Sequence, residues 1–181
     1  MDLISKLKHF DYFLTSIFVL GTDKELPLAE RVGIRMVDRK SISKLKALKL
    51  LFFTVAIDKS WSLLDNVFDN FCALPYGPVE SDIYDNLGNL PNYVLIGNDL
   101  KPKADATFDY GELPYKDQID KSVSLLAESY SKLFEMSAME LVELTHRSDC
   151  WIIPFEQAKA LGSMSRKMPA EVIKNTIVYF E

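Results

Sequence analysis

The sequence is poor in the residues that most often build metal sites and disulfide frameworks. Its 181 residues include only two cysteines, Cys72 and Cys150, and two histidines, His9 and His146. The cysteines form neither a disulfide framework nor a CxxC motif, and free thiols are typical of the reducing cytoplasm. We therefore predict a cytoplasmic protein with no disulfide framework and no bound metal.

The sequence also lacks the motifs that identify common classes of enzyme. It has no GxGxxG or GxxxxGK[ST] phosphate loop, no HExxH and no GxSxG. His146 and Cys150 are four residues apart, which suits two zinc ligands or a thiol–imidazole pair on one helix. However, Cys150 adjoins Trp151 and Ile152, an apolar setting in which cysteine is usually a small buried hydrophobe. We predict a protein that is not an enzyme and needs no cofactor, with the thiol dyad as the alternative.

Long apolar runs are missing as well. The run that imitates a signal peptide, residues 10–20, is interrupted by Asp11 and is too short to span a bilayer. No small-x-small cleavage site follows it. We predict neither a membrane segment nor a secretion signal.

An excess of positive charge is also absent. The net charge of -5 argues against a general nucleic-acid binder, because phosphate contacts need clustered Lys and Arg. Residues 1–59 carry 11 Lys/Arg against 7 Asp/Glu, whereas residues 60–181 carry 10 against 19. Solvated faces explain this asymmetry, and electrostatic orientation of a partner is the alternative. DNA contact would require a helix-turn-helix within residues 22–59 that exposes Arg31, Arg35, Arg39 and Lys40.

What the sequence does have is helical periodicity. Ser43 is suited to cap a helix, and Ser137 followed by Glu140 is a capping-box pattern. The wide apolar stripe of residues 43–59 predicts a central, buried helix. The polar residues 22–40 predict a loop or a short helix. The spacing of apolar residues predicts helices at 2–20, 43–59, 119–134, 137–146, 154–161 and 169–180.

Strand-like segments are few. Residues 67–74 are a candidate strand, and residues 93–96 and 107–110 suit a hairpin. Gly77 and Pro78 predict a sharp corner, because glycine takes backbone angles closed to other residues and proline fits the first turn of a helix. A helix is expected to follow, with Val79, Ile83, Leu87 and Leu90 on one face. The predicted fold class is mainly α with a minor β element, a short strand or hairpin, in a compact single-domain helical fold.

Three blocks of the sequence match a known pattern. Residues 45–53 (LKALKLLFF) look like an opening helix with a Leu-x-Lys-Leu-Leu-Tyr-type run. Residues 71–79 (FCALPYGPV) resemble an Ala-Trp-x-Tyr-Gly-Pro-Val block, and residues 141–151 resemble a Leu-x-x-Leu-Thr-His block followed by tryptophan. Together they resemble the Panacea (SocA-like) antitoxin family. The chain departs from that pattern at Leu74, where tryptophan is common, and at Phe53, near an expected tyrosine.

The resemblance implies an antitoxin from a bacterial or phage toxin–antitoxin system. Members of the family neutralise a cognate toxin by protein–protein contact, and one branch acts as an adaptor that hands its toxin to a protease. The alternative is a non-enzymatic accessory protein of a phage or mobile element with DNA contact. We expect residues 1–40 to be an N-terminal helical extension and residues 41–181 to be the Panacea-like domain.

Two sets of residues follow from this interpretation. Structural roles are assigned to the family-motif residues, with His146 and Trp151 packed near the corner: Leu50, Phe53, Tyr76, Gly77, Pro78, Val79, Thr145, His146 and Trp151. An antitoxin also needs an exposed apolar patch with a charged rim. The candidate partner contacts lie in the extension: Phe13, Ile17, Phe18, Arg31 and Arg35. The irregular segment 91–116 is a second place where this chain could select its own partner.

Overall fold

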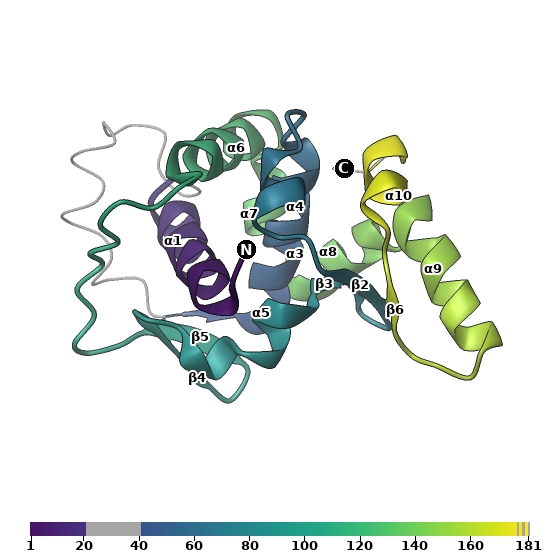
Figure 1. The fold of residues 1–181 in the computed structure, drawn as a ribbon, viewed down its shortest axis with the longest axis horizontal. Helices are drawn as coiled ribbons and strands as arrows, with labels where there is room; N and C mark the ends of the chain where they lie inside the picture. Colours follow the sequence, from purple (N-terminus) through teal and green to yellow (C-terminus); the bar gives the residue numbers. More distant parts are fainter. Residues whose placement is uncertain (21–40, 177, 179, 181) are drawn as a thin grey trace.

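The computed structural model describes residues 1–20, 41–176, 178 and 180. Its helices (Figure 1) are α1 (Leu3–Leu20), α3 (Lys44–Ile57), α4 (Ser62–Asn66), α5 (Ser81–Asp85), α6 (Lys116–Ser129), α7 (Lys132–Glu135), α8 (Ala138–Thr145), α9 (Asp149–Ala160) and α10 (Ala170–Asn175), with the 3-10 turn η1 (Leu87–Asn89). Its strands are β1 (Ile42–Ser43), β2 (Phe71–Leu74), β3 (Gly77–Glu80), β4 (Tyr93–Ile96), β5 (Asp99–Pro102) and β6 (Arg166–Lys167). The predicted fold class, mainly α with a minor β element, is confirmed.

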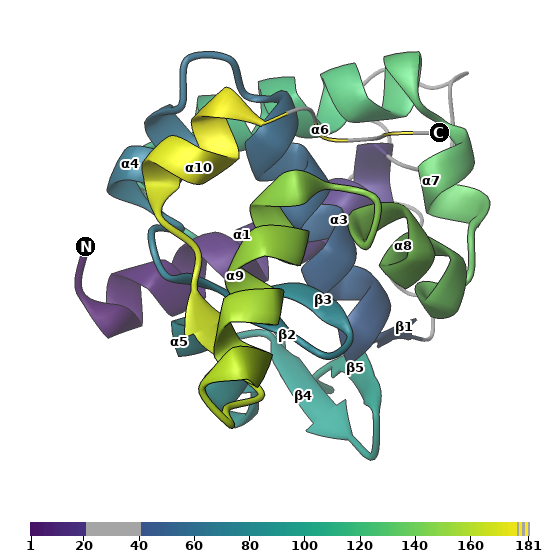
Figure 2. The same cartoon turned by 90° about the vertical axis from the view of Figure 1, so that its right-hand side faces the viewer.

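Helix α3 lies at the centre of the fold. Ser43 caps it, since its side-chain oxygen accepts a hydrogen bond from the Lys46 backbone amide at 3.2 Å. Every side chain from Ala47 to Ile57 is buried, because α6, α8 and β3 pack around the helix. Figure 2 shows α3 behind α9 and the β2–β3 hairpin. A helix that is apolar on most of its surface is stable only inside a core, as the sequence predicted.

Helix α1 packs on the same core. It lies along α6 and contacts α5 (Figure 1). Phe10, Phe13 and Leu14 have no exposed surface and belong to one cluster with the side chains of α3. The first helix is therefore docked on the body of the protein through its apolar stripe.

The strands form two small antiparallel sheets, ordered β1-β5-β4 and β3-β2-β6. In the second sheet, β2 and β3 form a tight hairpin in which Leu74 lies opposite Gly77. Strand β6 arrives from the C-terminal part of the chain and pairs with Cys72 and Ala73. The hairpin lies between α3, which contacts β3, and α9, which contacts β2.

The corner at Gly77 differs from the prediction. Pro78 does not begin a helix; residues 77–80 form strand β3, and the following helix begins only at Ser81. The reason is Glu80, whose carboxylate accepts a hydrogen bond from the Ile83 backbone amide at 2.9 Å and so caps α5. The helix predicted to run to Leu90 is correspondingly short, and η1 replaces its end.

Several other boundaries also differ. The partner of β4 is β5 rather than residues 107–110, because Gly97, at φ +62°, and Asn98 form a two-residue turn. The predicted helix 119–134 is broken at Tyr130. Helix α9 begins at Asp149 and continues through Pro154, held by its buried face, and α10 ends at Asn175 where Thr176 is extended.

Candidate functional site

Three side chains converge on the turn between β2 and β3. The Trp151 indole nitrogen donates a hydrogen bond to the Leu74 carbonyl at 2.9 Å. The His146 imidazole donates to the Pro75 carbonyl. The Lys49 ammonium donates to the Pro78 carbonyl at 2.6 Å. We call Lys49, His146 and Trp151 the donor cluster. The cluster therefore ties carbonyl groups of the β2–β3 hairpin to the helices packed around it.

Gly77 occupies the point where the turn meets this cluster. Its φ is +89°, a conformation that residues with a Cβ rarely adopt. A Cβ at this position would lie within 3.0 Å of the Lys49 Cε and closer still to the Thr145 hydroxyl. The positive φ and this close approach both require glycine at position 77. The Tyr-Gly-Pro-Val segment therefore packs closely against Thr145 of the Thr-His segment.

Lys49 is the residue of this site that the sequence interpretation missed. Its side chain has no exposed surface, and burial lowers the pKa of its ammonium to about 7. The available signal was a lysine within the apolar run of residues 47–53, on a helix predicted to be central. A charge there needs a local acceptor, and the acceptor is the Pro78 carbonyl.

The aromatic members of the cluster form a stack. The His146 ring lies on the Trp151 ring with centroids 3.8 Å apart, and Trp151 in turn stacks on Phe155 at 4.8 Å. Burial, and then the nearby charge of Lys49, lower the pKa of His146, so the imidazole is neutral at pH 7. Its buried Nε2 has no hydrogen-bond partner among the described residues. The structure thus places His146 and Trp151 against the corner.

The thiol–imidazole dyad and the zinc pair rest on the premise that His146 and Cys150 share one helix, and the structure does not meet this premise. His146 is the C-cap of α8, whereas Cys150 lies in α9, so they are not on one helix. Burial raises the pKa of the Cys150 thiol to about 11, and its sulfur lies 3.0 Å from the Ser148 hydroxyl. A thiol that stays protonated at neutral pH is a poor nucleophile and metal ligand.

A groove of about 400 Å³ opens beside the hairpin turn. We call this feature the groove. It runs between the N-terminus of α3 and the turn, and α8 borders it through Ala138. Its volume falls within the range of pockets that bind small ligands. The residues that line it are Ser43, Lys44, Leu45, Leu48, Leu74, Pro75, Tyr76, Val79, Tyr84, Asn98 and Ala138.

Exposed apolar side chains gather at this groove. Tyr76 and Tyr84 line it with 60% and 41% of their surface exposed. The Lys44 ammonium lies over the Tyr84 ring, 5.8 Å from its centroid. Tyr76 is thus a motif residue on the surface, which differs from the structural role expected for it. An exposed apolar patch with a charged rim is the property expected of a protein-binding site.

The candidate partner contacts of α1, in the N-terminal extension, are less exposed than the tyrosines of the groove. Phe13 is fully buried, Ile17 is 3% exposed and Phe18 is partly buried, because α1 is docked on α6 and the core. A partner cannot reach Phe13 or Ile17 in this structure, which corrects the expectation that these two residues contact the partner. Arg31 and Arg35, like Arg39 and Lys40 of the DNA-contact alternative, lie outside the described residues.

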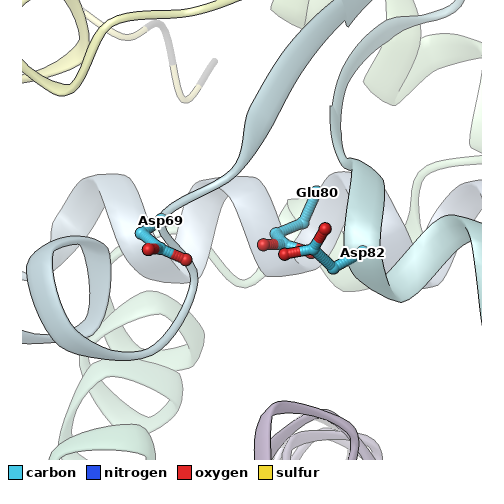
Figure 3. Close-up of side chains that lie close together, drawn as sticks. All are labelled: Asp69, Glu80 and Asp82. Atoms are coloured by element: carbon cyan, nitrogen blue, oxygen red, sulfur yellow. The ribbon is translucent and has the colours of Figure 1, made fainter. Parts of the chain in front are cut away.

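A cluster of three carboxylates lies where β3 meets α5 (Figure 3). Oxygen atoms of Asp69, Glu80 and Asp82 lie within 4.8 Å of one another. The Lys6 ammonium donates to all three, at 2.6, 2.8 and 2.5 Å respectively. Burial opposes the charge of Lys6, but these hydrogen bonds outweigh it and raise its pKa. The cation of this site is therefore a lysine, which ties α1 to the β3–α5 junction.

Comparison with known protein families shows which family this chain belongs to. A family model described as the antitoxin SocA-like Panacea domain matches residues 48–152. The chain belongs to this family. The matched Panacea segment contains the whole donor cluster and the β2–β3 hairpin, whereas α1 precedes it. The comparisons with curated proteins and with solved structures gave no match.

Within the part of the Panacea chain that the structure describes, no helix has both the length and the apolar character needed to cross a bilayer.

Proposed function

We propose that this chain is the antitoxin of a toxin–antitoxin pair and neutralises its toxin by direct protein–protein contact. Membership of the SocA-like Panacea family is the observation that carries the proposal. The groove supports it, because exposed Tyr76 and Tyr84 with Lys44 at the rim give an apolar surface of the kind that partner proteins bury.

A non-enzymatic mode of action is part of the proposal. Cys150 is buried with a raised pKa, and the donor cluster is occupied with backbone carbonyls. We also infer action in the cytoplasm, since Cys72 and Cys150 are both free thiols in the fold.

Co-expression with the adjacent genes tests the proposal. Each neighbouring gene is induced in a host cell with and without this chain. We expect one neighbour to arrest growth, this chain to restore growth, and the two purified proteins to form a complex. Absence of toxicity from both neighbours, or rescue without any complex, would count against the proposal.

The level of the toxin in the same cells distinguishes direct inhibition from delivery to a protease. If contact alone neutralises the toxin, its level stays constant while growth is restored. If the chain is an adaptor, the toxin disappears on co-expression and reappears in a host that lacks the responsible protease. A time course of toxin abundance after translation is blocked therefore assigns the route.

A further inference from the structure

The chemistry of the groove indicates what kind of segment fits it. Among the described residues that line it, Lys44 is the one ionisable residue apart from two tyrosines, and none is acidic. The groove is therefore apolar with one cationic end, although residues 60–181 carry an excess of acidic residues. A partner segment that is itself basic would meet a like charge there.

Helix geometry adds to the charge at the same end. Ser43, Lys44 and Leu45 line the groove at the N-terminus of α3, a helix of 14 residues. The aligned peptide dipoles place partial positive charge at that terminus, which favours a nearby anion. The cationic side chain and the positive helix end thus act together on whatever occupies the groove.

The opposite wall supplies apolar contacts. Leu48 and Val79 form a buried floor, while the exposed rings of Tyr76 and Tyr84 stand at the rim. Large side chains that enter such a pocket and lose their water are the usual anchors of protein interfaces. The donor cluster anchors the backbone of the turn that carries Tyr76, so this part of the wall is held in place before a partner binds.

We propose that the groove binds a segment of the partner protein in which a large apolar side chain lies next to a carboxylate. The apolar side chain packs between Tyr76 and Leu48, and the carboxylate lies near Lys44 and the α3 N-terminus. This inference rests on the proposed antitoxin function for the identity of the partner, but not for the chemistry of the segment.

Peptides test the chemistry without the toxin. The probe is a fluorescein-labelled octapeptide with adjacent Phe and Asp in a Gly-Ser background. The comparison peptides carry Lys in place of Asp, or Ala in place of Phe. We expect the Phe-Asp peptide to bind the full chain at least tenfold more tightly than either comparison peptide. Equal binding of all three, or binding of none, would overturn the proposal.

Variants of the chain locate the contact. Lys44→Glu and Tyr76→Ala should each weaken binding of the Phe-Asp peptide at least tenfold, whereas Lys44→Arg should keep it. The matched controls are Lys121→Glu and Leu161→Ala, exposed residues that do not line the groove. They should leave binding unchanged within twofold. An unchanged thermal unfolding midpoint shows that each variant is folded, and a folded Lys44→Glu chain with full affinity contradicts the proposal.

Cross-linking then tests the natural partner. The photoreactive residue p-benzoylphenylalanine replaces Tyr76, and the toxin identified by co-expression is added. We expect the cross-linked toxin peptide to contain a large apolar residue next to Asp or Glu. A basic cross-linked segment, or cross-linking to a second copy of this chain, would overturn this inference while leaving the antitoxin function intact. Failure of both neighbouring genes to be toxic would instead remove the function and leave the peptide result standing.

Discussion

The Trp151 indole lies almost parallel to the His146 imidazole, with an angle of 11° between the rings. The two side chains come from different helices, α9 and the end of α8, and both donate to the same hairpin turn. The stack therefore couples the two helices to the turn that carries Tyr76.

Replacing Trp151 by Phe should weaken this coupling. The variant keeps a stacking ring but loses the hydrogen bond from the indole to the Leu74 carbonyl, so we expect a loss of about 0.5–1.5 kcal/mol in unfolding free energy. Urea unfolding measures it, with Trp61→Phe, at the start of α4, as the matched control. A loss no larger than that of the control would show that the hydrogen bond contributes nothing.

Gly77→Ala should destabilise the chain by about 2–4 kcal/mol, because the alanine would be strained at positive φ and would collide with the Thr145 hydroxyl. Adding Thr145→Ala removes that hydroxyl and should recover part of the loss. A double-mutant cycle by urea unfolding measures the recovery. Strictly additive losses would mean that the collision is relieved elsewhere.

The lowered pKa of Lys49 predicts that the free energy of unfolding depends on pH. Its pKa is about 7 in the folded chain and about 10.5 when unfolded, so the unfolded chain binds more protons between these values. Stability should therefore rise with pH from 7 to 9, by up to about 1.4 kcal/mol per pH unit from this group.

Urea unfolding at several pH values between 7 and 9 compares the wild type with Lys49→Met. The variant should lack this rise, while the control Lys121→Met should keep it. Parallel pH profiles for wild type and Lys49→Met would contradict the assignment of Lys49 as the titrating group.

Lys6→Met should cost about 3–5 kcal/mol, because it leaves buried Glu80 charged without its cation. The double variant Lys6→Met/Glu80→Gln should be more stable than Lys6→Met alone. The control is the exposed Lys8→Met. Thermal and urea unfolding are the measurements, and a Lys6→Met chain as stable as the control would show that the ion cluster is dispensable.

Cys150 should resist thiol reagents in the folded chain. Its thiol is buried and its pKa is raised to about 11, whereas Cys72 is half-buried. At pH 8 we expect a maleimide to label Cys72 well before Cys150, and to label both in urea. Mass spectrometry of tryptic peptides reads the order, and rapid labelling of Cys150 would revive the thiol-enzyme alternative.

Local signals in the sequence predicted the elements whose causes are local. The apolar spacing of residues 2–20 and 43–59 predicted α1 and α3, and Ser137 with Glu140 forms the capping box that opens α8. These features depend on neighbours within one or two helical turns, which a single sequence displays.

Contacts between residues far apart in the sequence determine the features that the sequence did not predict. Glu80 caps α5 and is held by Lys6, which lies 74 residues earlier in the chain. The burial of Phe13 depends on α6 and the rest of the core, so an amphipathic pattern could not show which faces of α1 are covered. The groove is likewise made by segments far apart in the sequence, although Tyr76 had been identified as a motif residue.

The lysine–carboxylate cluster at Lys6 also limits how far the family-matched segment can be moved between proteins. A graft of residues 48–152 alone would carry Glu80 but leave behind the ammonium that neutralises it, and would uncover the surface on which α1 lies. We therefore expect any chimaera that transplants this Panacea segment, or any truncation that begins after α1, to need a substitute for that first helix in order to fold.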